Sequence, residues 1–535
     1  MIASRLRTHP SWAILLAALL CAALLAAPGQ TITTVYVNDL LIFLDGAHRI
    51  SVGQVPNRDF HTALGPLAFY LPAAGYWLSG NLGSALPTGM ALTVLTLAPV
   101  FAHVLSSRLA PLVALPLGLF LLLILAVPMN LGESIGSLSF AMFYNRIGWA
   151  ALALLLIMYL PARAAGPRQI GLDTACATFL ALVTIYTKAT YGVVALAFLS
   201  LMLIERRQRL WAISALAAVL AGALLVEAFW QSSGAHIEDL LLASRVSGAM
   251  QAEELVLGFL RHLADYVLFA ALAVLVLWQR WSWRHAIFFA FCAVPGLLIV
   301  SQNSQPWGII TLQAGAAVAA QLAIDANQRG LGRTSISAGA PVVFLALVLP
   351  TTLHCFLALG LHAGLAVARA GETFGLPRFD QIRLAQLWTP GDHQFSTRYL
   401  ASIREGARAL EGLPEKPEAV AVLDFVNPFS AGLGLKPPRG DSAWLHWGRN
   451  VSTEHHLPGE ELFGNVRFLL EPRWGINNLP LSELYGPHIR QAYEPVIETA
   501  SWTVHLRRDA TRADQRTAGN LGAGPGLGHG SGNTR

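Results

Sequence analysis

Charged residues are scarce in this chain of 535 residues. Aspartate, glutamate, lysine and arginine together make up 13% of it, whereas hydrophobic residues make up 54% and the mean hydropathy is +0.51. A soluble protein devotes about a quarter of its residues to charge. The composition therefore excludes a soluble globular enzyme and a disordered chain, and it indicates a protein whose surface is largely covered by lipid.

Cysteine is also rare, and all four cysteines fall inside apolar runs. No CxxC pair is present, so the sequence indicates neither a disulfide framework nor a thiolate metal site. The net charge is only +5, and no basic stripe is interleaved with aromatic residues, which argues against nucleic-acid binding. Walker A, Rossmann, HExxH and GxSxG motifs are absent as well, so no nucleotide cofactor is expected.

Long apolar runs, in contrast, are abundant. A membrane-spanning helix needs about 20 mostly apolar residues, and about eleven runs approach that length. They predict spans over 12–28, 86–106, 109–127, 147–162, 170–187, 189–204, 210–229, 263–279, 285–300, 307–323 and 340–362. The first run could be a cleaved signal peptide, but the many runs that follow it favour a first membrane helix.

The arginines predict the orientation of these spans. If the N-terminus is cytoplasmic, every loop assigned to the cytoplasm is basic, as the positive-inside rule requires. These loops carry Arg108, Arg163, Arg168, Arg206, Arg207, Arg209, Arg280, Arg284, Arg329 and Arg333. The alternation holds only if the apolar run 64–80 does not cross the membrane. We therefore expect it to lie at the outer interface, anchored by Tyr70, Tyr76 and Trp77.

After His362 the chain changes character. Residues 375–515 alternate charge, proline and short apolar stretches, with a helix predicted over 398–412 and strands over 419–426, 466–471 and 502–507. The expected fold is an all-α polytopic membrane bundle followed by a small α/β domain on the outer face. The corresponding boundaries are 1–362, 363–515 and a disordered, glycine-rich tail over 516–535.

Asp39 directly follows the first span, where an unpaired carboxylate is costly. Residues 39–52 have a helical pattern, in which Asp45 and Arg49 are four residues apart and can form an ion pair. Asp39 lies on a different face of that helix and has no evident local partner. It serves either as the N-cap of the helix or as a functional carboxylate.

The first outer loop, over 29–86, carries a recognisable pattern. Its residues are Asp39, Ala47, Gly53, Pro56, Arg58, Asp59, Phe60, Gly65, Pro66, Leu67 and Tyr70. This pattern resembles the first outer loop of the GT-C glycosyltransferases. Among them are the aminoarabinose and protein O-mannosyl transferases, and the closest resemblance is to the rhizobial lipopolysaccharide glycosyltransferase-like group. The segments FYNRIGWA (143–150) and TKATYG (187–192) resemble later motifs of that group, and LDFVNPFSAGLG resembles it weakly.

The resemblance implies a polytopic enzyme that uses a polyprenyl-phosphate sugar as donor. It assigns Asp39 the role of catalytic carboxylate and makes 64–80 the second of two juxtamembrane helices in the loop. Two departures are notable. Leu40 follows Asp39 where many relatives have a glutamate, and Leu64 and Gly65 stand where the aminoarabinose group has a lysine.

A donor phosphate in a site of low dielectric must be neutralised. The candidate cations on the outer face are Arg58, Arg146 and Lys188. Structural alternatives exist for each of them. Arg146 and Lys188 could extend to lipid headgroups, and Arg58 could pair with Asp59.

Other polar residues on the outer face are secondary candidates. Glu133 is an acid in the second outer loop and could bind a divalent cation together with Asp39, although two carboxylates are few ligands for such an ion. His48 and His61 are expected to be hydrogen-bonded or exposed rather than metal ligands. The remaining candidates, for contact with substrate or for helix capping, are Asp59, Asn145, Gln302 and Asn303.

Together these features predict an inverting glycosyltransferase in a bacterial inner membrane. Asp39 would act as general base on the periplasmic face, with a polyprenyl-phosphate-linked sugar as donor and an envelope glycan or lipid as acceptor. A transporter or flippase of lipid-linked saccharide is an alternative, as is a non-catalytic membrane protein with an outer domain. Convergence of Asp39, Arg146 and Lys188 on one outward-open cavity would favour the enzyme.

Overall fold

The computed structural model describes residues 10–248, 252–302, 305–329, 339–388, 390–464 and 466–508. The predictions for Asn303, Arg333 and the tail 516–535 lie outside these residues.

Every apolar run that was predicted to span the membrane forms a helix. These helices are α2 (Pro10–Ala26), α5 (Ala85–Arg108), α6 (Pro111–Ala126), α7 (Phe143–Ile157), α8 (Pro167–Thr187), α9 (Ala189–Met202), α10 (Arg209–Trp230), α13 (Leu263–Gln279), α14 (Trp283–Ser301), α15 (Ile310–Gln328) and α16 (Ala340–Val367). By length and composition, 5 of the described helices can cross a membrane, or 6 if the bent pair α12 (Ala252–Arg261) and α13 is one span. Four of the others, α2, α6, α7 and α9, are shorter apolar helices. The chain is therefore a polytopic helical membrane protein.

Apolar side chains cover the outside of the bundle as well as its inside. Leu224 and Phe229 on α10 are 65% and 81% exposed, whereas Trp149 on α7 is completely buried. A helix that is apolar on all sides satisfies its outer face with lipid, and its backbone groups are satisfied within the helix.

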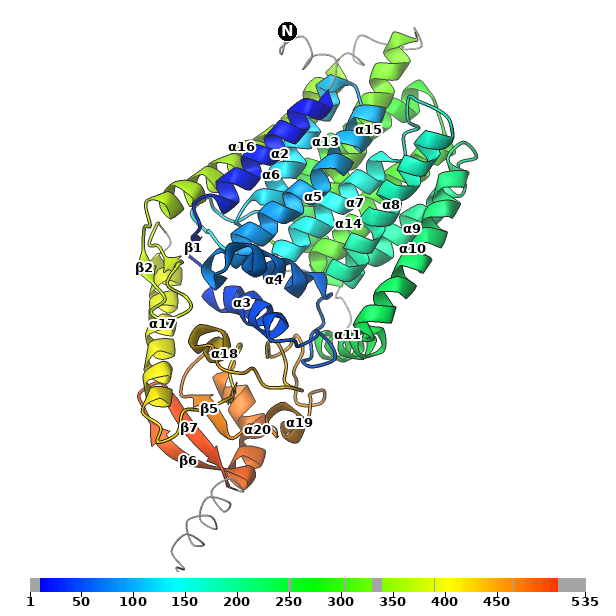
Figure 1. Cartoon of the computed structure of the whole chain (residues 1–535). Coiled ribbons are helices and arrows are strands. Elements are labelled where there is room, and N and C mark those ends of the chain that lie inside the picture. The colour runs from blue at the N-terminus through cyan, green and yellow to red at the C-terminus, as the bar shows by residue number, and fades with distance from the viewer. Residues whose placement is uncertain are drawn as a thin grey trace, which may run out of the picture.

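The two ends of the bundle differ. At one end, here called the arginine end, Arg108 pairs with Asp173 at 2.7 Å and Arg284 pairs with Glu205 at 2.8 Å. The opposite end is called the capped end, because α3 (Val37–Ser51), α4 (Leu67–Ser79) and the C-terminal domain cover it (Figure 1). The apolar run 64–80 thus forms α4, which lies across the capped end. It does not run parallel to the spans, in agreement with the prediction from the charge pattern. The 3₁₀ turn η1 (Leu82–Ser84) leads from α4 into α5.

The C-terminal domain contains a four-stranded sheet of order β4-β5-β7-β6. Its strands are β4 (Val420–Val422), β5 (Phe468–Pro472), β6 (Tyr493–Glu498) and β7 (Trp502–Arg507), and its helices are α17 (Pro390–Glu411), α18 (Pro428–Leu433), α19 (Gly459–Phe463) and α20 (Asn478–Ala492). The predicted strand 419–426 is too long, since the chain leaves the sheet after Val422. Asn427 then caps α18, because its Oδ1 accepts a hydrogen bond from Phe429 N at 3.1 Å.

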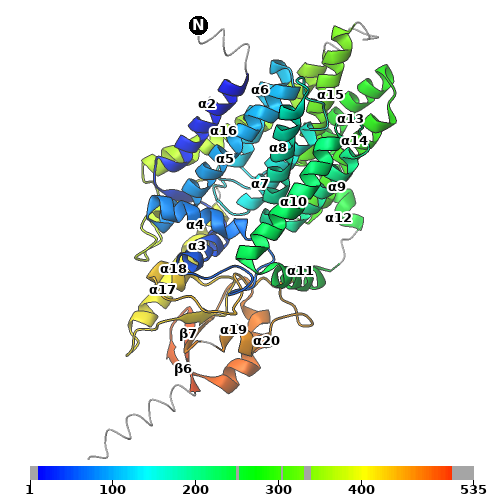
Figure 2. The same cartoon turned by 45° about the vertical axis from the view of Figure 1, so that its right-hand side comes forward.

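This domain is joined to the first loop by a second sheet and by a buried ion cluster. In the sheet, β1 (Thr31–Thr33) pairs in parallel with β3 (Ile382–Leu384), and β3 pairs with β2 (Glu372–Thr373). In the cluster, the fully buried Arg49 on α3 binds Asp45 at 2.5 Å and both carboxylate oxygens of Asp441 at 2.7 Å. Helix α11 (Ser233–Ser247) lies between the end of α10 and the domain (Figure 2). The first loop and the domain therefore form one continuous cap over the bundle.

Candidate active site

Asp39 lies in the first turn of α3. The helix begins at Val37 and is preceded by Tyr36, whose φ of 56° places it in the left-handed region. The N-cap role considered for Asp39 is therefore wrong, because the helix starts two residues earlier than its apolar pattern suggests. Burial raises the pKa of the Asp39 carboxyl to about 6, while a hydrogen bond from its own backbone N–H acts in the opposite direction. Such a carboxylate is ionised at neutral pH and is a stronger base than an exposed aspartate.

Tyr36 links the start of α3 to the loop between α6 and α7. Its hydroxyl donates to Glu133 Oε1 at 2.7 Å, and the charges of Glu133 and Asp39 both act on it. Among the residues that the structure describes, no group of three histidine, cysteine, aspartate or glutamate side chains could hold a metal ion. The pair of Asp39 and Glu133 does not by itself make a divalent-cation site.

Lys188 lies at the break between α8 and α9, where its backbone is extended. Its Nζ donates to Asn145 Oδ1 at 3.4 Å and lies 5.5 Å from the ring centre of Tyr144. The hydroxyl of Tyr144 is also within electrostatic range of Asp39. Tyr144 therefore lies beside Lys188 and within electrostatic range of Asp39, and the break between α8 and α9 places the lysine at the capped end.

An apolar groove of about 620 Å³ adjoins this cluster. Residues of α4, α5, α7, α8 and α10 line it, among them Tyr70, Leu71, Leu92, Leu97, Ile147, Phe179, Leu182, Tyr186, Leu225, Phe229 and Trp230. Tyr186 lies two residues before Lys188, and Ile147 lies two residues after Asn145. Asn145 and Lys188 therefore lie beside one part of the groove wall.

A close approach of two backbones brings α4 to that wall. Gly65 N donates to Thr187 O at 3.2 Å, and a Cβ atom on Gly65 would overlap the carbonyl group of Tyr186. Glycine is therefore required where this loop meets the end of α8.

Arg146 follows Asn145 in the chain and makes its hydrogen bonds to two backbone carbonyl groups. Its Nη1 donates to Met129 O at 2.9 Å and to Ala141 O at 3.3 Å, and its side chain is buried. The guanidinium thus holds the loop between α6 and α7 in place. Its Nε and Nη2 atoms have no hydrogen-bond partner within the described part of the chain.

The charge of Arg58 acts on Tyr70, a residue of the groove wall. Arg58 pairs with Asp59 at 3.6 Å, the structural alternative considered for it, and Asp59 also lies 3.4 Å from Arg439. Gln302 is exposed at the end of α14.

Comparison with solved structures finds a similar chain. This chain is similar to the crystal structure of ArnT from Cupriavidus metallidurans bound to undecaprenyl phosphate. The two are 16% identical, the match covers 92% of this chain and 97% of that one, and the TM-score is 0.45. No family model and no curated protein matches the chain. The roles proposed for individual residues rest on the geometry of this chain.

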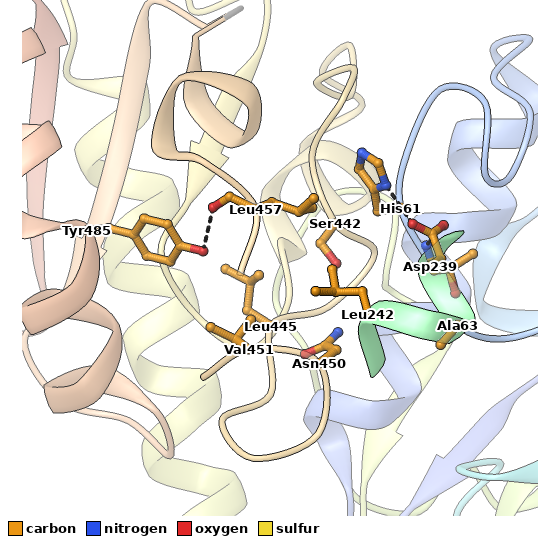
Figure 3. Close-up of a pocket in the computed structure, with 11 residues that line it drawn as sticks. His61, Ala63, Asp239, Leu242, Ser442, Leu445, Asn450, Val451, Leu457 and Tyr485 are labelled. Carbon is orange, nitrogen blue, oxygen red and sulfur yellow. Dashed lines mark hydrogen bonds and ion pairs between the residues drawn. The ribbon is translucent and has the colours of Figure 1, made fainter. Parts of the chain in front are cut away.

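The histidines of the first loop are hydrogen-bonded, as expected. His48 Nε2 contacts Leu435 O at 2.8 Å, and His61 lies between two carboxylates, at 2.7 Å from Asp239 and 3.1 Å from Glu461. Burial lowers the pKa of His61, but its two acidic partners outweigh this effect and the net shift is upward. Figure 3 shows His61 and Asp239 beside a small hollow whose other wall belongs to the C-terminal domain.

Sequence reasoning missed the contribution of the C-terminal domain to this region. Tyr399 on α17 lies beside Asp424, and the charge of Asp39 also acts on it. Arg449 lies within electrostatic range of both Tyr144 and Lys188. The only sequence signal near these residues is the weak motif that contains Asp424. No local pattern distinguishes Arg449 from the other arginines of the domain, because its position depends on tertiary packing.

Proposed function

We propose that this chain is a membrane glycosyltransferase that transfers a sugar from a polyprenyl-phosphate donor to an envelope glycan or lipid. The observation that carries the proposal is the position of Tyr144. This residue is next to Lys188, which adjoins the apolar groove, and it is also within electrostatic range of Asp39. The groove matches the prenyl chain, Lys188 matches the phosphate, and the Tyr144 ring matches the sugar.

In this proposal Asp39 is the general base. It accepts the proton of the acceptor hydroxyl as the hydroxyl oxygen bonds to the anomeric carbon. The bond between that carbon and the phosphate oxygen breaks with inversion, and the polyprenyl phosphate leaves with its electron pair. Lys188 stabilises the negative charge that grows on the phosphate. Asp39 is held apart from basic side chains: none lies within ion-pair distance of it in the described ranges.

The proposed location is a bacterial inner membrane, with the N-terminus cytoplasmic and the capped end in the periplasm. The concentration of arginines at the opposite end supports this orientation. Lipid-linked sugars and envelope acceptors would then meet at the capped end, where Asp39 and Lys188 lie.

The test is a transfer assay on the purified protein in lipid nanodiscs, supplied with polyprenyl-phosphate sugars and an envelope extract. Release of polyprenyl phosphate is measured by mass spectrometry. Asp39→Asn should reduce the rate by about 10²–10⁴-fold, the usual contribution of a general base. The variant should keep its thermal midpoint, because burial disfavours the charge that the substitution removes.

Asp380→Asn provides a matched control, since Asp380 is an exposed aspartate of the segment that follows α16. It should leave the rate unchanged. Full activity in Asp39→Asn would refute the assignment of the base. Movement of intact lipid-linked sugar across the bilayer, with no transfer in the wild type, would instead identify a flippase.

A further inference from the structure

His61 in the first loop faces a carboxylate with each of its two ring nitrogens. Its Nδ1 lies 2.7 Å from Asp239 Oδ1 on α11 (Figure 3), and its Nε2 lies 3.1 Å from Glu461 Oε1 on α19 of the C-terminal domain. A neutral imidazole has only one N–H group, so it would turn a lone pair toward one of these anionic oxygens. The imidazolium donates to both of them. The geometry therefore favours a protonated His61, and we call the contact Asp239–His61–Glu461 the His61 bridge.

Asp239 also binds the loop on either side of this histidine. Its side chain is buried, and its Oδ2 accepts hydrogen bonds from Asn57 Nδ2 at 2.7 Å and from Thr62 N at 2.9 Å. These donors orient the carboxylate and stabilise its charge. The segment 57–62 is therefore folded around one acid of α11.

The same segment is bonded to the C-terminal domain through its backbone. His61 N donates to Asp441 O at 2.8 Å, and His61 O accepts from Ala443 N at 2.9 Å. Gly440 N donates to Asp59 O at 2.8 Å. These three bonds are here called the joint. His61 thus lies where the first loop, α11 and the C-terminal domain meet.

The other ionisable groups around His61 have partners of their own or are uncharged. Those with partners are Asp59, which lies between Arg58 and Arg439, Asp441, which binds Arg49, and Tyr485, which donates its hydroxyl to Leu457 O. Burial lowers the pKa of His236 on α11, although the charge of Asp239 acts against this effect. His236 is therefore uncharged in the pH range where His61 loses its proton.

We propose that the His61 bridge is a pH-sensitive switch that fastens the C-terminal domain to the first loop and to α11. The inference goes beyond the proposed function, because it concerns how the cap is held together and assumes nothing about the substrate. Burial lowers the pKa of His61, but the carboxylates of Asp239 and Glu461 more than offset this effect, and the pKa rises above its ordinary value of 6.5.

The direction of the pH dependence follows from this upward shift. A group whose pKa is higher in the folded state contributes stability that is fully present below its ordinary value, here 6.5. That contribution is lost as the pH rises through the raised value. The bridge therefore holds the cap together in a mildly acidic medium and weakens it as the medium becomes alkaline.

Hydrogen exchange of the full-length protein in nanodiscs tests the switch. Protection factors, corrected for the intrinsic pH dependence of exchange, are measured for peptides over 57–64 and 438–445, which contain the joint. The measurements are made at about pH 5.5 and about pH 8.5, on either side of the usual range of histidine. In the wild type, protection of the joint should fall by roughly three- to tenfold at the higher pH, as expected for charge-assisted hydrogen bonds of which one has a partly solvated acceptor.

Two variants separate the bridge from other effects of pH. His61→Gln should show one reduced level of protection at both pH values, because glutamine cannot carry the charge. Glu461→Gln should show a smaller pH dependence than the wild type. This second variant is expected to fold, since the Glu461 side chain is 44% exposed.

His505→Gln is the matched control. His505 Nε2 lies 3.0 Å from Glu471 Oε2, but both residues belong to the four-stranded sheet, so this pair does not cross the joint. Its peptides at the joint should keep the pH dependence of the wild type. Equal protection of the wild-type joint at the two pH values would overturn the switch. Full wild-type pH dependence in His61→Gln would overturn it as well.

Discussion

Asp39 combines two properties that single residues of a membrane protein rarely share. It is a carboxylate at the membrane boundary without a cationic partner among the described residues, and its surroundings raise its pKa to about 6. Partial burial penalises the charge, and no neighbouring lysine or arginine in the described ranges compensates. A structural carboxylate would be expected to have such a partner, as Asp45 has in Arg49. This contrast between two acids on one helix supports the role that we propose for Asp39.

The raised pKa of Asp39 predicts the pH dependence of the reaction. Below about pH 6 the carboxyl is protonated and cannot accept the proton of the acceptor. We expect kcat/KM to fall by roughly tenfold for each pH unit below that value and to be level above it. A pH-rate profile of the wild type checks this. An acidic limb near pH 4, the ordinary value for aspartate, would show that Asp39 is solvated in the working enzyme.

At the scale of elements, α3 and α4 are held by different means. Helix α4 meets the end of α8 through the bare backbone of Gly65. Helix α3 is fastened to the C-terminal domain through Arg49, whose guanidinium also lies 5.0 Å from the ring centre of Phe60. One side of the groove thus depends on a close backbone approach, and the position of Asp39 depends on a buried ion cluster.

Gly65→Ala should disturb the groove. The added Cβ atom would overlap the carbonyl group of Tyr186, so α4 and the α8–α9 break must move apart. We expect weaker binding of undecaprenyl phosphate, by about tenfold or more, because both the groove wall and Lys188 are displaced. Gly171→Ala is the control, since Gly171 lies in α8 and a Cβ atom there would have open space within 4 Å. Equal binding by the two variants would contradict this role of Gly65.

Arg49→Met should weaken the attachment of the domain. The substitution leaves the Asp45 and Asp441 carboxylates buried without their cation, a change that costs about 3–5 kcal/mol. We expect a lower thermal midpoint and faster proteolytic cleavage of the C-terminal domain. The triple variant Arg49→Met, Asp45→Asn, Asp441→Asn should recover much of the loss, since it removes the unpaired charges. No recovery would mean that packing of the arginine, and not its charge, holds the domain.

At the scale of the whole molecule, the chain has an arginine end and a capped end. The arginine end carries the ion pairs of Arg108 and Arg284, and the capped end carries Asp39, Lys188 and the C-terminal domain. A catalyst that joins a lipid-borne donor to an envelope acceptor needs such a polarity, because the two substrates meet at one face of the membrane.

Cysteine labelling in intact cells can test this orientation. The natural cysteines lie within the bundle helices, and three of the four are buried. Glu454→Cys at the capped end should react with a membrane-impermeant maleimide, whereas Arg207→Cys at the arginine end should react only after permeabilisation. Both positions are exposed. The reverse pattern would place Asp39 in the cytoplasm and contradict transfer at the outer face.

Local and periodic features of the chain were sufficient for much of the fold. The lengths of the apolar runs predicted the bundle helices, and the alternation of arginines required α4 not to cross. The spacing of Asp45 and Arg49 predicted their ion pair. In each case the physical cause acts within one segment, through helix length, charge or an i,i+4 contact. The start of α3 was predicted less well, because a left-handed tyrosine precedes the helix, and the predicted strand 419–426 extends beyond the end of β4 at Val422.

The sequence by itself determined that this is a polytopic membrane protein with a first loop rich in candidate groups, since hydropathy, charge order and short-range spacing are written along the chain. Only the tertiary structure decided which of those groups meet. It gave Arg146 backbone carbonyl partners, placed Tyr144 beside Lys188, and brought Arg449, from more than 250 residues away along the chain, within electrostatic range of Lys188. Contacts between distant segments depend on how helices and domain pack in three dimensions, and no local pattern encodes that packing.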